Sequence, residues 1–218
     1  MFIPLRICNF VPEMKIFGIE KNYLAHNNSQ ADTFYIEEPP VLFTKADSAL
    51  LTGGKPFFLP NYAQRCECGI GVVVRICHLG RSIPERFAHR YYEELTVGVD
   101  FTASDLLESL REKSLPWDVA KGFDGSAAVG RWIAKERFLN VQNLHFRLEK
   151  NGKVIQEGCT CQMIHQVDAL ISYISQFFTL KTGDLLYTGT LENVDTVHID
   201  DHLVGYLEGE NVLEFNVK

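Results

Sequence analysis

The sequence predicts a mixed α+β domain in which β-strands dominate. Short apolar segments, β-branched or alternating with polar residues, recur along the whole chain and are separated by turn residues. Helical spacing of apolar residues is confined to a few segments. No internal repeat, low-complexity run or interdomain linker divides the 218 residues, so one domain is the simplest organisation.

Four strands are expected in the first half of the chain. Residues 70–76 are β-branched and almost continuously apolar, which indicates a strand buried on both faces. Residues 95–101 carry an apolar side chain at every second position, the period of a strand. Shorter strands are expected at 15–19 and, after Pro39-Pro40, at 41–43.

Three helices are expected. A short one covers residues 84–92, and a second begins near Asp105 with leucines at helical spacing and is stopped by Pro116. The longest covers residues 167–178 and is amphipathic. Its expected core face consists of Leu170, Ile171, Ile174 and Phe177.

The second half of the chain is expected to consist mostly of strands. Residues 144–150 alternate, Asn151-Gly152 is a strong hairpin turn, and residues 153–156 form the returning strand. Two more strands are expected at 185–187 and 212–217.

The charge and hydropathy of the chain exclude two classes of partner. Its 28 acidic residues outnumber 21 Lys and Arg, a formal net charge of −7, whereas nucleic-acid phosphates require a basic surface. No run approaches the roughly 20 apolar residues of a transmembrane helix. Pro4, Arg6, Asn9 and Pro12 interrupt the N-terminal apolar stretch, so no signal peptide is expected. We therefore expect a cytoplasmic protein without nucleic-acid or membrane partners.

The six cysteines are expected to be reduced thiols. They are Cys8, Cys66, Cys68, Cys77, Cys159 and Cys161. Two C-x-C pairs differ from the C-x-x-C spacing of zinc knuckles, and alternate residues on a strand point the same way. Without a secretory signal, a reducing cytoplasm is the better interpretation. A soft-metal site at Cys66 and Cys68, with or without Cys77, is a minor alternative.

Six segments in consistent order and spacing resemble the fumarylacetoacetate hydrolase family. The strongest is 179–190, Thr-Leu-Lys-Thr-Gly-Asp-Leu-Leu-Tyr-Thr-Gly-Thr. The others are 14–19, 22–26, 42–45, 99–103 and 121–126. The resemblance implies a single family domain at 14–218, with residues 1–13 as an N-terminal extension and Met14 as the natural first residue.

The resemblance also implies a fold, a cofactor and a chemistry. The fold would be a β-sandwich roll like the C-terminal domain of fumarylacetoacetase, assembled as a homodimer with Mg²⁺ or Mn²⁺ near the open end of the sheet. Family members act on small 2-oxo or 1,3-dicarbonyl acids by C–C bond hydrolysis, decarboxylation or enol isomerisation. The cation chelates the acid and stabilises the enolate, while a His-Glu pair moves the proton or activates water.

The metal ligands that the resemblance implies are only partly present. The family uses a Glu-x-Glu on one strand and an Asp about thirty residues later, and Asp100 matches that Asp; alternatively it caps the helix at Asp105. Counting without gaps places Gly69 and Gly71 at the two Glu positions. Glu67 lies two residues upstream, roughly 6.5–7 Å along the strand. It would be a metal ligand if the strand slips by two residues, and otherwise an exposed glutamate.

The resemblance assigns five further residues. His26 matches the catalytic His, and Lys121 would lie beside the metal or the substrate carboxylate. The alternatives are a solvated loop histidine and a surface lysine. Lys45, Thr188 and Thr190 are the expected substrate-binding residues.

Two substitutions leave the activity open. Ser29 stands where the Glu partner of His26 is expected, and Ser104 where an Arg would hold a substrate carboxylate. One hypothesis is therefore a Mg²⁺- or Mn²⁺-dependent enzyme acting on a small oxo acid. The other is a non-catalytic relative, without a cofactor, that binds a small acid or acts through its dimer surface.

Overall fold

The computed structural model describes residues 14–23 and 38–218 as two packed β-sheets with flanking helices. The larger sheet contains β1 (Ile16–Glu20), β2 (Val41–Lys45), β3 (Leu50–Leu51), β4 (Cys66–Ile76), β5 (Tyr92–Ala103), β6 (Ala127–Val129), β7 (Ile133–Ala134), β10 (Leu185–Tyr187) and β11 (Asp195–Thr196). The smaller sheet contains β8 (His145–Lys150), β9 (Lys153–Cys159), β12 (His202–Leu207) and β13 (Glu210–Asn216). The helices are α2 (Glu85–Ala88), α3 (Ser104–Glu112), α4 (Asp118–Lys121) and α5 (Val167–Phe177).

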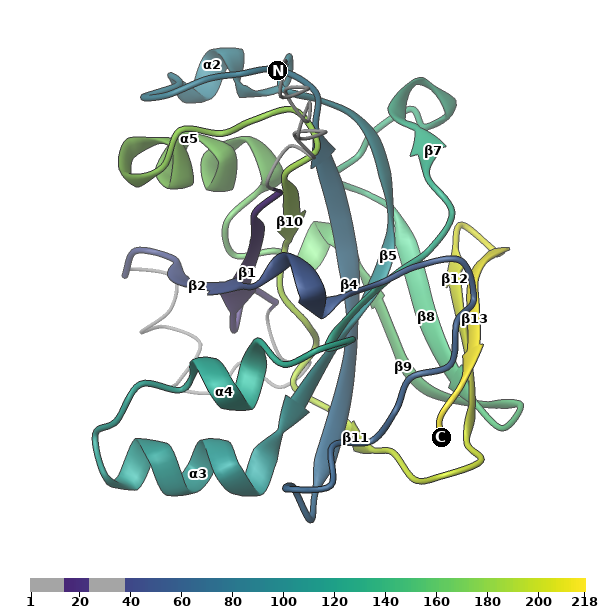
Figure 1. The fold of residues 1–218 in the computed structure, drawn as a ribbon. Helices are drawn as coiled ribbons and strands as arrows, with labels where there is room; N and C mark the ends of the chain where they lie inside the picture. The colour runs from purple at the N-terminus through teal and green to yellow at the C-terminus, as the bar shows by residue number, and fades with distance from the viewer. Residues whose placement is uncertain (1–13, 24–37) are drawn as a thin grey trace, which may run out of the picture.

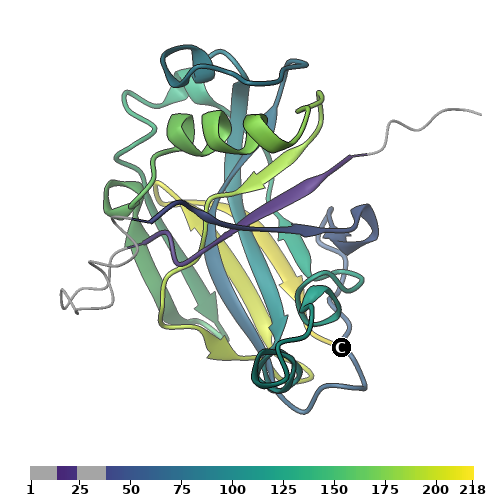
Figure 2. The ribbon, with the colours of Figure 1, turned by 90° about the vertical axis from the view of Figure 1, so that its left-hand side faces the viewer.

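The strand order places β4 and β5 at the centre of the molecule. The larger sheet runs β2-β1-β10-β4-β5-β6-β3, with β11 beside β4 and β7 beside β5, and the smaller runs β13-β12-β8-β9. The smaller sheet lies on one side of β4 and β5, and the helices lie on the other (Figure 1). In the turned view, α5 crosses one end of the larger sheet, and α3 lies at the other end (Figure 2). This arrangement confirms the predicted β-dominated α+β class.

Side-chain alternation along β4 divides the interior into two layers. Cys66, Cys68 and Val72 belong to the main hydrophobic cluster, which also includes Phe146 and Leu203 of the smaller sheet. The intervening positions of β4 therefore face the other side of the sheet, toward the helices. This second face carries Glu67, Gly69 and Gly71, so the strand presents its polar and glycine positions together.

Antiparallel pairing holds β4 and β5 in a fixed register. The pairing runs from Cys66 opposite Ala103 to Ile76 opposite Tyr92 and shifts once, between Arg75 and Ile76. The expected strands at 70–76 and 95–101 are therefore the inner parts of two longer strands. Propensity at the ends is weak, because Cys, Glu and Gly precede the β-branched run in β4.

Two local predictions have different outcomes. Asn151 and Gly152 both have positive φ, 53° and 76°, as the predicted two-residue hairpin turn requires. The expected core position of Phe177 is wrong, because its side chain is 56% exposed and packs edge-on against Tyr173. The helix ends at Phe177, and Phe178 then takes an extended backbone and contacts the ring of Phe17.

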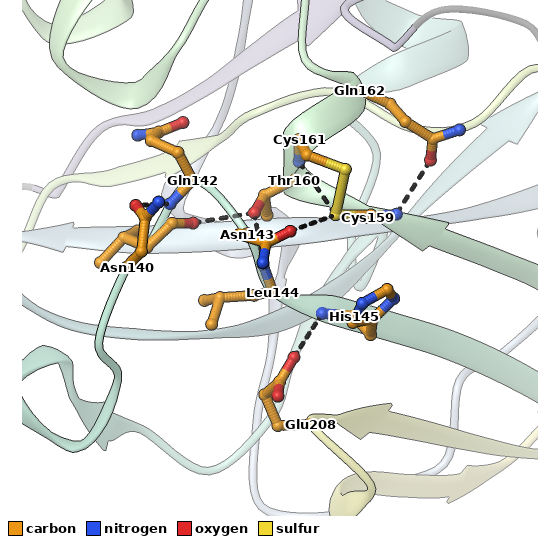
Figure 3. The surroundings of a disulfide bond; sticks show 11 residues. Asn140, Gln142, Asn143, Leu144, His145, Cys159, Thr160, Cys161, Gln162 and Glu208 are labelled. Atoms are coloured by element: carbon orange, nitrogen blue, oxygen red, sulfur yellow. Dashed lines mark hydrogen bonds between the residues drawn. A yellow bond between two sulfur atoms is a disulfide. The ribbon is translucent and has the colours of Figure 1, made fainter.

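The prediction of reduced thiols is wrong for one cysteine pair. The structure joins Cys159 and Cys161 in a disulfide (Figure 3). Thr160, the residue between them, fixes the local turn because its hydroxyl donates to the Val141 carbonyl and accepts from the Leu144 amide, each at 2.8 Å. The two sulfurs are close because this turn follows directly after β9, a contact that C-x-C spacing on a regular strand does not predict. Among the described cysteines, Cys66, Cys68 and Cys77 are free.

Across residues 14–23 and 38–218, no helix combines the length and the apolar character that crossing a membrane requires.

Candidate active site

A small polar cavity is lined by residues from the ends of β4 and β5 and from α3 and α4. These two helices lie low in the view of Figure 1. The volume of the cavity is about 210 Å³. Pockets for drug-sized ligands measure about 300–1,000 Å³, so this cavity suits a molecule of a few carbon atoms. The charged and polar side chains that line it include Glu20, Glu67, Asp100, Arg111, Lys121 and Thr190.

Asp100 is the centre of the charged network beside this cavity. It lies on β5 with 8% of its surface exposed, and it contacts two ammonium groups. Its Oδ1 is 2.6 Å from Lys45 Nζ, and its Oδ2 is 2.7 Å from Lys121 Nζ. Burial alone would raise the pKa of Asp100, but the two ammonium groups outweigh burial and hold this pKa below its ordinary value. The helix-cap alternative is wrong, because the N-cap residue of α3 is Ala103 and no side chain caps it.

Lys121 comes from the end of α4 and is buried, so the surface-lysine alternative is wrong. Besides Asp100, its Nζ has Thr102 Oγ1 at 3.0 Å and Glu20 Oε1 at 3.2 Å. Burial alone would lower the pKa of Lys121, but Asp100 and Glu20 reverse that effect and raise it. Lys121 is therefore an ammonium cation at neutral pH and lines the cavity.

Lys45 lies behind Asp100, in the protein interior. Its ammonium donates to the Ser126 carbonyl at 2.8 Å, the Ser126 hydroxyl at 3.0 Å and the Phe101 carbonyl at 3.3 Å. Burial lowers the pKa of Lys45 to about 8. The cavity wall does not include Lys45, so it acts on the cavity through Asp100, and its predicted contact with substrate stays a prediction.

Glu67 lies on the same face of the sheet as Asp100. Gly69 is paired with Asp100 and Glu67 with Thr102, and paired residues of antiparallel strands share a face. The Ser104 hydroxyl donates to Glu67 Oε2 at 2.5 Å. The sequence therefore located a carboxylate of this cavity correctly, although the role of Glu67 as a metal ligand stays a prediction.

The two glycines of β4 leave no room for the missing carboxylates. A Cβ at Gly69 would lie 2.8 Å from Thr190 Cβ, so the Thr190 side chain fills that space. A Cβ at Gly71 would lie only 1.8 Å from the carbonyl oxygen of Gly189. Position 71 is therefore closed by backbone and position 69 by the Thr190 side chain, whereas Glu67 lines the cavity.

The donor set of this cavity does not fit a three-carboxylate cation site. Both oxygens of Asp100 are within 2.7 Å of an ammonium nitrogen, and position 69 supplies no ligand. Among the described residues, no three carboxylates, imidazoles or thiols of the cavity bring their ligand atoms within 4.8 Å of one another. The positive charges next to Asp100 are those of lysines.

The two predicted threonines occupy different environments. Thr190 lines the cavity. Thr188 is fully buried, and its hydroxyl donates to the Val72 carbonyl at 2.8 Å and lies 3.1 Å from the Tyr23 hydroxyl. Thr188 thus lies outside the cavity wall, and its substrate contact stays a prediction. The predicted catalytic His26 and the substituted Ser29 lie outside the described residues.

Sequence reasoning missed Arg111 and Glu20. Arg111 lies on α3, with its guanidinium 4.9 Å from the ring centre of Trp117 and an Nη2 nitrogen 3.8 Å from Glu20 Oε1. A signal for Arg111 was present in the chain. It follows Ser104 by seven residues, about two helical turns, so both residues lie on one face of α3. Glu20, at the end of β1, gave no such signal.

Comparisons with known proteins identify similar sequences and similar structures. The profile of the family described as fumarylacetoacetate (FAA) hydrolase C-terminal matches residues 15–217. The mitochondrial oxaloacetate tautomerase FAHD1 of Mus musculus is 33% identical over 203 residues, which cover 93% of this chain and 91% of that protein.

Solved structures share the fold at similar identity. Fumarylpyruvate hydrolase from Pseudomonas aeruginosa, in complex with Mn²⁺ and pyruvate, has a TM-score of 0.85 and 29% identity, covering 94% of this chain and 90% of that one. The 2-hydroxyhepta-2,4-diene-1,7-dioate isomerase from Mycobacterium marinum has a TM-score of 0.81 and 28% identity, covering 94% and 74%.

Proposed function

Because this chain belongs to the fumarylacetoacetate hydrolase family, we propose that its cavity beside Asp100 binds a small 2-oxo acid and catalyses keto–enol tautomerisation. One observation carries the proposal: Glu67, Arg111 and Lys121 converge on a cavity of about 210 Å³. A carboxylate and two cations are the groups that proton transfer on an oxo acid requires.

Arg111 supports the binding of the acid. Ser104 stands where the resemblance leads us to expect an arginine, and Arg111 on the same face of α3 lines the same cavity. The 3.8 Å contact between Arg111 and Glu20 is longer than a hydrogen bond, and Trp117 supports the guanidinium plane from one side. The guanidinium can therefore turn its N–H groups toward a carboxylate of the ligand.

Glu67 and Lys121 would carry the proton transfer. The Glu67 carboxylate removes a proton from C3 of the keto acid, and the electron pair moves onto the carbonyl oxygen. An N–H of Lys121 stabilises this enolate oxygen, which then takes a proton from solvent to give the enol, while Glu67 returns the proton that it removed to solvent. The reverse path uses the same groups. Hydrolysis of a C–C bond would in addition require an activated water, so tautomerisation demands the least of the residues present.

We expect the acid to bind without a divalent cation. In the fumarylpyruvate hydrolase complex the protein holds Mn²⁺ together with pyruvate. In this chain, Lys45 and Lys121 contact both oxygens of Asp100, and Thr190 fills the space beside Gly69. Lysine and arginine side chains thus supply the positive charge facing the ligand.

The test is to measure the turnover of oxaloacetate in the presence of EDTA, with the loss of enol absorbance as the readout. We expect Glu67→Gln to lower kcat by about 10²–10⁴-fold, the usual contribution of a general base. The matched control is Glu108→Gln on α3. It removes a carboxylate that pairs with the same Arg65 but lies at the cavity rim, 65% exposed, so kcat should change little. Equal turnover by wild-type protein and Glu67→Gln would refute the role of Glu67.

The second candidate function is a non-catalytic relative that binds an acid without converting it. The observation that favours it is the Thr190 side chain in the space where position 69 would carry a carboxylate. Binding of oxalate without turnover of oxaloacetate would establish this alternative.

Three further expectations belong to the same proposal. The chain would form one domain at 14–218, supported by a main hydrophobic cluster that extends from Phe17 to Val217. It would be a homodimer, supported by an exposed apolar hollow at Val119 and Phe123, and sedimentation analysis would test this. It would lie in the cytoplasm, which fractionation of cells would test.

A further inference from the structure

A second cluster of ligating side chains lies at the opposite end of β4 from the cavity. Cys77 directly follows this strand, His78 is the next residue, and Glu93 lies on β5. One ligand atom from each of the three lies within 4.8 Å of the other two. The strand rises about 3.3 Å per residue, so this cluster is roughly 30 Å from Glu67 along β4.

A β-bulge positions Glu93 in this cluster. Arg75 is paired with Glu94 and Ile76 with Tyr92, so Glu93 is the extra residue of the bulge. The bulge interrupts the regular alternation of side chains along β5. Tyr92 and Leu95 are three residues apart, yet both belong to the main hydrophobic cluster. Bulges of this kind re-aim one side chain out of the regular alternation. Here the re-aimed carboxylate faces Cys77 and His78.

Backbone contacts hold the Cys77 segment in place. The Cys77 amide donates to the Tyr91 carbonyl at 2.8 Å, and the Cys77 carbonyl accepts from the Thr182 hydroxyl at 3.0 Å. The His78 ring packs edge-on against the Tyr91 ring. Cys77 is half-buried, whereas His78 and Glu93 are exposed, so the ligand atoms are reachable from solvent.

We propose that Cys77, His78 and Glu93 bind a zinc-type divalent transition metal. A thiolate, an imidazole and a carboxylate are the three protein ligand types of Zn²⁺, and three ligands leave one tetrahedral position for water. When the metal binds, the Cys77 thiol loses its proton to solvent. It therefore also loses its hydrogen bond to the Arg90 carbonyl, which is 3.5 Å away. The metal would tie the end of β4 to β5, and it would therefore stabilise the fold.

This site replaces the soft-metal alternative drawn from the sequence. Cys66 and Cys68 lie in the main hydrophobic cluster, and burial raises the pKa of each thiol to about 12. Neither can reach Cys77, which lies beyond the other end of β4. The zinc-type site is also independent of the oxo-acid cavity, so each proposal can fail without the other.

The experiment is a titration of the full chain with Co²⁺ under reducing conditions, followed by competition with Zn²⁺. We expect one equivalent of Co²⁺ to produce a thiolate-to-cobalt charge-transfer band and Zn²⁺ to remove it. Cys77→Ser should abolish the band, and Glu93→Gln should weaken binding by at least about 10-fold. The melting temperature of the wild type should rise with Zn²⁺, whereas that of Cys77→Ser should not.

The matched controls are the double variant Cys159→Ser/Cys161→Ser and the variant His89→Ala. They remove the two sulfurs of the disulfide, which become thiols under the reducing conditions, and an exposed imidazole elsewhere. Both variants should retain the band and its stoichiometry. Two results would overturn the proposal: no band in the wild type, or a band that survives Cys77→Ser.

Discussion

At the scale of single residues, the molecule depends on the carboxylate of Asp100. Lys45 and Lys121 are both buried and contact its two oxygens, and Glu20 is a further acidic partner of Lys121 alone. A buried ammonium without a partner is costly, so the carboxylate permits both lysines to remain charged. It also holds the Lys121 ammonium at the edge of the cavity.

Asp100→Asn should therefore lower the free energy of unfolding by about 3–5 kcal/mol at pH 7, as expected when one partner of a buried ion pair is removed. Urea denaturation measures this loss. Asp200→Asn is the control, because Asp200 pairs with Lys218 at the surface, 77% exposed, and such pairs contribute at most about 1 kcal/mol. Equal losses in both variants would contradict the account.

The same carboxylate predicts a dependence on pH. The pKa of Asp100 is lower in the folded state than the roughly 3.9 of an unfolded aspartate. Its stabilising contribution is thus fully present above about pH 5 and is lost as the pH falls below about 4, through the folded-state pKa. The difference in unfolding free energy between wild type and Asp100→Asn should narrow in that acid range. A constant difference down to the lowest pH at which both fold would contradict this prediction.

Arg111 gives a third prediction at this scale, on substrate affinity rather than on stability. Arg111→Met keeps an apolar stem against Trp117 but removes the guanidinium, and a hydrogen bond to a charged group contributes about 1.5–3 kcal/mol. The KM for oxaloacetate should rise about 10- to 100-fold with little change in kcat, since Arg111 would contact the non-reacting carboxylate. Steady-state kinetics measure this split. Lys113→Met, two residues further along, should match the wild type.

The sequence located Asp100, Lys121 and Glu67 at the cavity but not Arg111. Asp100 and Lys121 were found because their segments resemble a family pattern position by position, whereas Glu67 was reached only by allowing the strand to slip by two residues. Arg111 lies seven residues after Ser104, where the resemblance leads us to expect an arginine, and only the helical period connects the two positions. A count along the chain placed the two missing carboxylates at Gly69 and Gly71. The structure pairs Gly69 with Asp100, and it packs the Gly189 carbonyl against Gly71, so position 71 has no room for a side chain.

At the scale of elements, β4 is shaped by close approach of the segment that follows β10. The carbonyl of Gly189 packs against Gly71, and Gly189 itself has a φ of 111°, a conformation that favours glycine. Two glycines facing each other allow this backbone to cross the sheet. The crossing brings Thr190 to the cavity.

Gly71→Ala should destabilise the protein more than Gly69→Ala, although both lie on the same face of β4. The new Cβ at 71 would overlap a backbone oxygen at 1.8 Å, whereas at 69 it would meet Thr190 at 2.8 Å. Overpacking costs about 1–3 kcal/mol, and we expect Gly71→Ala at or above the upper end of that range. Denaturant unfolding of the two variants checks the order. The reverse order would contradict the packing described for this strand.

The prediction of elements succeeded where periodicity was strong. Residues 70–76, 144–150 and 167–178 were found because burial gives them an unambiguous pattern. The short strands β6 and β7, and also β12, were not expected. β6 consists of Ala127, Ala128 and Val129, a run of three residues in which the two alanines carry little strand propensity, so its pairing with β5 is imposed by the tertiary fold.

At the scale of the whole molecule, the two proposed sites lie at opposite ends of β4 and β5. The cavity beside Asp100 is at one end, and Cys77 and Glu93 are at the other. The acidic excess of −7 does not mark either site. In the cavity, the carboxylates of Glu20, Glu67 and Asp100 each have a lysine or arginine nitrogen within 3.4 Å, so the local charge is balanced.

The most direct test of this account is a calorimetric titration of oxalate, a planar mimic of a pyruvate enolate, into the full chain with EDTA present throughout. The account predicts binding at one site per chain, weakened about 10-fold or more by Arg111→Met and retained in Glu67→Gln. The contradicting result is the absence of binding in EDTA together with binding once Mn²⁺ replaces EDTA. Such a result would show that the positive charge facing the acid comes from a divalent cation and not from Lys121 and Arg111.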